Sequence, residues 1–282
     1  MALRIINADE RMASAHMRGS VFVGGGYKVG KTSLLYTLPE AETLYLDFES
    51  GDKSVQTWGG DQIKIRDFID AVDIACMVGG VDPSSGPNDM FSQLHYDRVM
   101  KNYGGEIDMG RYRYVFFDSA SQLSVAAAKF AKQQPESYTD KGKFDAWGMY
   151  GLIAQNMLRI VTHMQHSKKN CIFIGLLEQA EDAFKRPYWR IQMEGSKTAR
   201  ELPGIVDQVV TMCIADFNET TGEWAPNDNG AHRIFVCHRA NPWGFPAGTR
   251  SVGNVDMIEE PHLGKLIAKL NTPPQIAKDK TS

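Results

Sequence analysis

The chain has 282 residues, of which 43% are hydrophobic and 23% are charged, and its formal net charge is −3. This composition is typical of a soluble globular protein that is long enough for one large α/β domain with a well-buried core. The slight negative charge excludes a protein that coats nucleic acid through a basic surface on all sides. A local basic channel remains compatible with it.

The cysteines and the hydropathy of the chain indicate the compartment. Four cysteines stand far apart and form no CxxC pair: Cys76, Cys171, Cys213 and Cys237. This spacing argues against a zinc site and favours buried, reduced thiols. No apolar stretch approaches the ~18 residues needed to cross a bilayer, and the N-terminus has no apolar signal region. We therefore expect an intracellular, cytoplasmic protein that does not act at a membrane.

Short apolar runs alternate with helical patterns, which predicts an α/β fold with a mainly parallel central sheet and flanking helices. The expected strands are Ser20–Val23, Thr43–Phe48, Ile63–Arg66, Arg113–Asp118 and Cys171–Leu176. Two later runs enclose a turn-rich spacer and are expected to form a C-terminal antiparallel hairpin, Gln208–Ala215 with His232–His238. Helices are expected at Ser119–Lys132 and Tyr150–His166.

No linker or repeat interrupts this order, so one domain is expected over residues 1–271. The remaining segment from Thr272, "TPPQIAKDKTS", has little to bury and is expected to be disordered.

The stretch "VFVGGGYKVGKTS" from Val21 to Ser33 fits the phosphate-binding pattern G-x4-G-K-[ST] behind a predicted strand. Its glycines let the backbone wrap around phosphates with N–H groups pointing inward. Lys31 would place a positive charge at the β- and γ-phosphates, and the Thr32 hydroxyl would ligate Mg²⁺. The sequence thus predicts ATP and Mg²⁺ as cofactors. The predicted nucleotide-binding residues are Gly25, Gly26, Tyr27, Lys28, Val29, Gly30, Lys31, Thr32 and Ser33.

Two acidic residues follow predicted strands and complete the expected catalytic site. Asp118 ends the strand in "YRYVFFDSAS" and would hold the magnesium shell through water, so Thr32 and Asp118 form the predicted metal site. Glu49 follows the strand in "LYLDFESG" and would polarise the water that attacks the γ-phosphate. Asp47 is the alternative, because it could face the same site or hydrogen-bond the loop.

Several phrases give the chain a family resemblance in addition to these motifs. They are "IINADERMA", "FSQLHYDRVM", "KFDAWGMYGLIAQNML", "ELPGIVDQVVTM" and "NPWGFPAGTRSVGNVDMIEEPHLGKLIAKL". With the order of the phosphate loop, Glu49 and Asp118, they make the chain resemble the RecA/RadA-like P-loop ATPases. More narrowly, it resembles the compact bacteriophage ATPases of the AAA family that are described as single-strand-annealing recombinases. The resemblance extends from about Ile5 to Leu270.

The resemblance implies a RecA-like core that assembles as a ring or filament on single-stranded DNA and hydrolyses ATP between subunits. It implies that Gln179 senses the γ-phosphate, with Glu178 as the alternative. It also implies that Arg250 reaches the nucleotide of the neighbouring subunit as a catalytic cation. Relatives often carry Lys-Asp-Arg where this chain reads Gly248-Thr249-Arg250, so only the arginine matches.

The segment "AFKRPYWRIQMEGSKTAR", Ala183–Arg200, combines cations with aromatic residues, as a single-strand site requires. The predicted DNA-binding residues are Lys185, Arg186, Tyr188, Trp189, Arg190, Lys197 and Arg200. The alternative is a solvated basic loop whose two aromatic side chains pack on the domain.

Three functions follow from these observations. The first is an ATP-dependent recombinase or annealing ATPase that binds single-stranded DNA. The second is a nucleotide-switched loader or scaffold that acts on a protein partner, such as a single-strand-binding protein, without gripping DNA. The third, a small-molecule P-loop kinase, is disfavoured because no arginine-rich lid follows Asp118.

Overall fold

The computed structural model describes residues 5, 7, 9–10, 19–105, 107–251 and 254–272. The predicted disordered tail lies outside the described residues from residue 273 onward. Within the described ranges, no helix is both long and apolar enough to span a bilayer. All four cysteines are free thiols; Cys213 is half-buried and the other three are buried.

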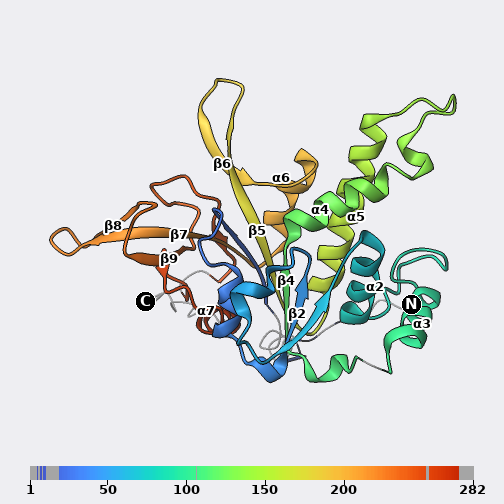
Figure 1. Cartoon of the computed structure of the whole chain (residues 1–282), viewed down its shortest axis with the longest axis horizontal. Coiled ribbons are helices and arrows are strands. Elements are labelled where there is room, and N and C mark those ends of the chain that lie inside the picture. Colours follow the sequence, from blue (N-terminus) through green and yellow to red (C-terminus); the bar gives the residue numbers. More distant parts are fainter. Residues whose placement is uncertain are drawn as a thin grey trace, which may run out of the picture.

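A parallel sheet forms the centre of the molecule (Figure 1). Its six parallel strands lie in the spatial order β7-β1-β5-β4-β2-β3. Their bounds are β1 Ser20–Gly25, β2 Thr43–Asp47, β3 Asp61–Lys64, β4 Tyr114–Asp118, β5 Asn170–Glu181 and β7 Gln208–Asn218. The α/β fold with a mainly parallel sheet is therefore confirmed.

Antiparallel strands extend the sheet beyond β7, and others pair with the ends of its long strands. β9 (His232–Val236) pairs with β7, and β11 (Ile258–Glu259) pairs with β9, so the predicted C-terminal antiparallel pair is present. Three further strands pair antiparallel with the long strands: β6 (Pro187–Ile191) pairs with β5, while β8 (Glu223–Pro226) and β10 (Gly248–Thr249) pair with β7.

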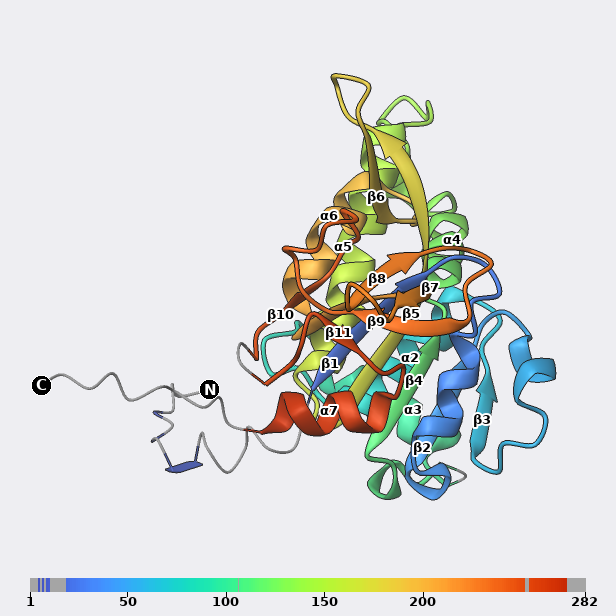
Figure 2. The same ribbon diagram turned by 90° about the vertical axis from the view of Figure 1, so that its left-hand side faces the viewer.

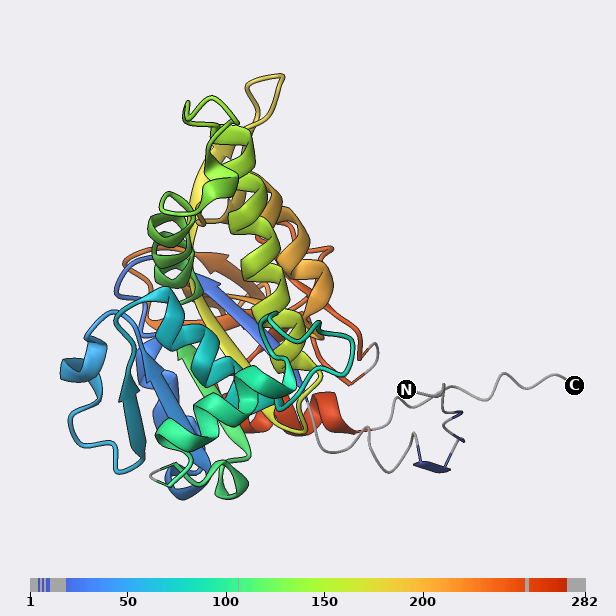
Figure 3. The same ribbon diagram turned by 90° about the vertical axis from the view of Figure 1, so that its right-hand side faces the viewer.

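Helices cover the two faces of the sheet unequally (Figures 2 and 3). One face carries α2 (Phe68–Gly79), α3 (Gln93–Tyr103), α4 (Ala120–Ala131), α5 (Ala146–Gln165) and α6 (Ser196–Ile205). The other face carries α7 (Leu263–Asn271) and the 3-10 helix η1 (Thr32–Thr37). Four short 3-10 turns complete the described elements: η2 (Glu40–Glu42), η3 (Gly51–Val55), η4 (Met109–Arg111) and η5 (Pro135–Ser137).

The central strands are apolar on both sides because both faces of the sheet are covered. Along β1, Phe22 packs into the cluster beneath α2–α6, whereas Val21 and Val23 pack into the cluster beneath η1 and α7. All three side chains are fully buried. The continuous apolar run "VFV" therefore reflects a buried parallel strand rather than an amphipathic edge strand.

Two differences from the sequence prediction affect the region of the phosphate loop and the β5–β6 hairpin. The phosphate loop is followed by a six-residue 3-10 helix, since Pro39 forces Leu38 into an extended conformation and ends the turn. Strand β5 continues five residues past the predicted end at Leu176, because its last part pairs with β6. The segment Ala183–Arg200, expected as a loop, is thus the tip and second strand of a hairpin followed by α6.

The β5–β6 hairpin and the connection between α4 and α5 both project from the same end of the molecule (Figures 1 and 3). This is the end at which β1, β4 and β5 finish, because parallel strands end at a common edge. In open α/β sheets this carboxyl edge is where ligands bind.

Candidate nucleotide site

The loop between β1 and η1 turns tightly around a small space. Lys28 and Gly30 adopt positive φ values of 57° and 99°. A β-carbon on Gly25 would lie 2.6 Å from the carbonyl oxygen of Met212, so the chain passes too close to β7 for any other residue. Gly25 and Gly30, the two glycines of the G-x4-G pattern, are therefore required by the local geometry.

The Lys31 side chain folds over this loop. Its Nζ donates hydrogen bonds to the carbonyl oxygens of Gly25 (3.1 Å) and Gly26 (2.6 Å). Burial lowers the pKa of Lys31, while the charges of Asp118 and Glu49 oppose that shift. The ammonium group thus sits in the loop and within electrostatic reach of both predicted acids.

Thr32 and Asp118 meet although 86 residues separate them. The Thr32 hydroxyl donates to Asp118 Oδ2 at 2.6 Å. Burial raises the pKa of Asp118 to about 6, with a smaller contribution from the charge of Glu49 and an opposing one from the Thr32 hydrogen bond. A buried carboxylate of this kind is stabilised by a cation placed beside it.

The side chains of Glu49 and Asp47 have different hydrogen-bond partners. Asp47 is buried and holds the turn after β2, since its carboxylate accepts hydrogen bonds from the backbone N–H groups of Glu49 (3.0 Å) and Gly51 (3.2 Å). It also accepts one from Gln62 Nε2 at 2.7 Å. Glu49 instead points to β4, where its Oε1 accepts a hydrogen bond from the Ser119 hydroxyl.

Sequence reasoning did not identify Ser119 as part of the site. Ser119 caps α4, accepting from the backbone N–H of Gln122 at 3.2 Å, and orients Glu49 at the same time. Its signal was its position directly after Asp118, which brings it to the same strand end.

The residues brought together fit a magnesium–nucleotide pair. Among the described residues, no group of three or more His, Cys, Asp or Glu side chains could hold a metal ion. Mg²⁺ is usually bound through one or two protein oxygens together with water and phosphate oxygens. Thr32 Oγ1 and Asp118 Oδ2 are such oxygens, and the adjoining loop offers backbone donors to phosphates.

The predicted DNA-binding residues lie on two elements, the β5–β6 hairpin and α6. Lys185, Arg186 and Tyr188 are exposed on the β5–β6 hairpin, with Arg186 paired to Asp182 at 2.7 Å. Arg190 pairs with Glu178 at 2.7 Å on the flank of the hairpin.

Trp189 turns inward, and its ring lies 5.5 Å from that of Phe245. Tyr188 is 44% exposed and therefore offers the freer ring. Lys197 and Arg200 are exposed on α6 rather than on the hairpin.

The two candidates for a γ-phosphate sensor differ in their partners. Glu178 is held by its ion pair with Arg190. Gln179 is exposed opposite Trp189 in the β5–β6 ladder, and its side chain makes no hydrogen bond within the described part of the chain.

Arg250 lies far from the phosphate loop of its own chain. It follows β10, which pairs with Gln208 at the start of β7, whereas the phosphate loop leaves the opposite end of the neighbouring β1. Its guanidinium donates to Asp207 Oδ1 (3.1 Å) and to the carbonyl oxygen of Gly204 (2.6 Å). Arg250 is therefore not placed to contact a nucleotide in the phosphate loop of its own chain.

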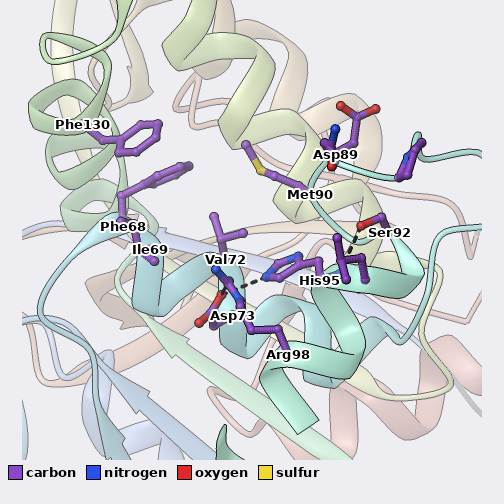
Figure 4. A pocket seen from close by; sticks show the side chains of 13 residues that line it. Phe68, Ile69, Val72, Asp73, Asp89, Met90, Ser92, His95, Arg98 and Phe130 are labelled. Carbon is purple, nitrogen blue, oxygen red and sulfur yellow. Dashed lines mark hydrogen bonds and ion pairs between the residues drawn. The ribbon is translucent and has the colours of Figure 1, made fainter. Parts of the chain in front are cut away.

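A separate cavity of about 520 Å³ lies beside α2 and α3 (Figure 4). The buried Asp73 carboxylate accepts hydrogen bonds there from His95 Nε2 (2.8 Å) and Arg98 Nη2 (2.6 Å). Because His95 Nδ1 accepts from the backbone N–H of Phe91, the three side chains satisfy one another. The network joins α2 to α3 and includes no residue of the phosphate loop.

The profile of the AAA domain family (AAA_24) matches residues 18–251 of the chain. The chain belongs to this AAA domain family. The matched region contains the phosphate loop, both acids and the β5–β6 hairpin, and the protein is an AAA-type P-loop ATPase.

No curated protein sequence matches the chain. Among solved structures, this AAA domain is similar to an ATPase from the type III secretion system of pathogenic bacteria, with 10% identity and a TM-score of 0.37. That match covers 74% of this chain and 55% of the other, so the chain spans about half the length of the secretion ATPase. A KaiC-like protein from Pyrococcus horikoshii OT3 has 12% identity and a TM-score of 0.35, over 77% of each chain.

Proposed function

We propose that this AAA-type ATPase hydrolyses ATP at the carboxyl edge of its sheet and uses the energy to remodel an oligomer on single-stranded DNA, as a RecA-like recombinase or annealing protein. The observation that carries the proposal is the meeting of Lys31, the Thr32–Asp118 pair and the Ser119–Glu49 pair at one edge of the sheet. The exposed hairpin rises from the same edge.

Each side chain has a defined task in hydrolysis. The loop amides and the Lys31 ammonium bind the phosphates, and Thr32 and Asp118 hold Mg²⁺. When bound, Mg²⁺ supplies charge neutralisation at the β- and γ-phosphate oxygens. Glu49 accepts a hydrogen bond from the attacking water and directs it toward the γ-phosphate, while Ser119 keeps the Glu49 carboxylate in place.

The single-strand contact is assigned to the β5–β6 hairpin. Lys185, Arg186 and Arg190 would track phosphates, and Tyr188 would stack on a base. The connection between α4 and α5 and the first turn of α5 add exposed rings: Phe144 in the connection is 52% exposed, and Trp147 in α5 is 89% exposed. Exposed aromatic groups beside cations favour unpaired bases over duplex DNA, because base faces are accessible only in single strands.

Oligomerisation completes this proposal. Arg250 would act in trans on the nucleotide of the next subunit of a ring or filament. Gln179 on β5 would sense the γ-phosphate and transmit its presence to the β5–β6 hairpin. The protein would then act in the cytoplasm, inside the host cell if the gene belongs to a bacteriophage.

A loader that acts on a protein partner, such as a single-strand-binding protein, is the alternative. The ion pairs of Arg186 with Asp182 and of Arg190 with Glu178 favour it, because paired guanidinium groups attract phosphates less strongly. Phe184, 79% exposed at the hairpin tip, would suit an apolar protein contact.

The experiment that tests the proposal is the ATPase rate with and without single-stranded DNA, together with the size of the protein in solution. We expect DNA to raise the rate and ATP to favour an oligomer. If the protein does not bind single-stranded DNA and its ATPase rate does not change when DNA is added, the recombinase proposal is wrong and the loader is favoured.

A further inference from the structure

Strand β9 brings a second cation to the phosphate loop, from the side opposite the acids. Arg233 is the second residue of β9 and pairs with Ile214 of β7. On β7, Met212 pairs with Gly25, so Ile214 lies two residues beyond the end of β1. The register thus places Arg233 level with the phosphate loop.

The face of the sheet is also the appropriate one. Side chains alternate along a strand, so Arg233 shares its face with Phe235. Phe235 packs in the same cluster as Val29 of the phosphate loop and Leu34 of η1. Arg233 therefore projects on the side of the sheet where the loop turns into η1.

The guanidinium reaches the loop itself. A β-carbon built on Gly30 would lie 3.1 Å from both Cζ and Nη1 of Arg233. Gly30 is the glycine directly before Lys31, and the Arg233 side chain is exposed. Within the described residues, its guanidinium makes no hydrogen bond and no ion pair, in contrast to Arg250, Arg190 and Arg186.

An unpaired guanidinium against an anion-binding loop is placed to bind the anion. The acids Glu49 and Asp118 follow β2 and β4, on one side of β1, whereas β9 lies on the other side, across β7. The backbone amides of such a loop cradle the α- and β-phosphates. A planar fork of donors beside Gly30 can add bidentate hydrogen bonds to the same oxygens.

From this juxtaposition we infer that Arg233 is a nucleotide-binding residue that contacts the α- or β-phosphate of a nucleoside di- or triphosphate in its own subunit. The inference rests on the proposed assignment of the loop as the nucleotide site. It requires neither DNA nor a second subunit.

The test is calorimetric titration of the purified full chain with ADP and Mg²⁺, and then with inorganic pyrophosphate as a competitor. Arg233→Ala should weaken ADP binding by about 10-fold, the loss of one charge-assisted hydrogen-bonding group, and pyrophosphate competition by a similar factor. Arg233→Lys should recover part of the affinity, because it restores the charge but not the fork.

Two variants serve as controls. Arg113→Ala removes one positive charge beside β4 at the opposite edge of the sheet, where Arg113 makes an exposed ion pair with Glu42, and should bind ADP like the wild type. Lys31→Ala should lose ADP binding. Circular dichroism establishes that each variant is folded, which we expect since Arg233 is exposed.

The outcomes separate the inference from the function on which it rests. Equal ADP affinity in Arg233→Ala and the wild type, with binding lost in Lys31→Ala, overturns the role of Arg233 and leaves the loop assignment standing. Equal affinity in both variants overturns the loop assignment as well. Weakened ADP binding with unchanged pyrophosphate competition would place the guanidinium on the nucleoside and overturn the phosphate contact.

Discussion

The buried Asp118 carboxyl is suited to bind a ligand cation, but its burial lowers the stability of the ligand-free protein. Its pKa of about 6 in the folded state exceeds the ordinary 3.8, chiefly because of burial. The folded form therefore holds the proton more tightly than the unfolded form. Consequently, ionisation of Asp118 lowers the free energy of unfolding as the pH rises from about 4 to about 6, and the loss persists above that range.

Asp118→Asn removes this ionisation while leaving an oxygen for the Thr32 hydroxyl. Without nucleotide, we expect the variant to be more stable than the wild type at pH 7 by about 3 kcal/mol, and most of the difference to be lost near pH 4. Denaturant unfolding at the two pH values measures this. A variant that is less stable than the wild type at pH 7 would show that Asp118 is already compensated. ATP hydrolysis should be lost in the same variant.

The pair Glu49 and Asp47 provides a matched comparison at the residue scale. Glu49→Gln should keep ATP binding and the stability of the fold but slow turnover by roughly 10²–10⁴-fold, as expected for loss of a general base. Asp47→Asn should instead lower the melting temperature, because the buried Asp47 carboxylate organises the turn after β2. Wild-type turnover in Glu49→Gln would exclude Glu49 as the base.

At the scale of elements, the β5–β6 hairpin is a strand pair that extends past the edge of the sheet. Because its ladder continues β5, the hairpin is connected to the sheet beside β1, from which the phosphate loop leaves. A change of the nucleotide could thus alter the hairpin through a single strand. The ring of Trp189 packs against that of Phe245. Tyr188 and the tip of the hairpin are exposed and accessible to a ligand.

Replacing Lys185, Arg186 and Arg190 together with alanine should weaken single-strand binding and reduce its salt slope by about two, since each phosphate contact contributes about 0.7. Fluorescence anisotropy with an oligonucleotide at several salt concentrations measures both quantities. The control triple Lys101→Ala, Arg113→Ala and Lys168→Ala removes equal charge elsewhere on the molecule and should bind like the wild type. An unchanged slope in the hairpin variant excludes this hairpin as the DNA site.

At the scale of the whole molecule, the site of one chain is incomplete if Arg250 takes part. Arg250 lies at the edge of the sheet opposite the phosphate loop, so two such edges must meet between subunits for it to act. This arrangement would make hydrolysis depend on assembly, which is the property that the proposed ring or filament requires.

Subunit mixing tests that dependence directly. Lys31→Ala and Arg250→Ala proteins should each be inactive, and mixing them should restore part of the ATPase rate, because some interfaces then combine an intact phosphate loop with an intact arginine. ADP binding in Arg250→Ala should remain, and its melting temperature should stay close to that of the wild type, since Arg250 makes exposed contacts. A mixture no more active than its components would contradict action in trans.

The sequence by itself determined the alternation of strands and helices, the phosphate loop and the acid at the end of β4. Those features are encoded locally: an apolar run, a glycine pattern and a charged residue next to it are visible in a few consecutive positions. The parallel direction of the central strands follows from that alternation, but their spatial order does not.

Only the tertiary structure gave Glu49 and Asp47 their different partners, turned Trp189 inward, extended β5 beyond Leu176 and brought Arg233 to Gly30. Each of these depends on a partner that is distant in sequence, as in the 86 residues between Thr32 and Asp118 or the 70 between Glu49 and Ser119. Strand order and register set such meetings, and no local pattern encodes them, because side chains interact through space rather than along the chain.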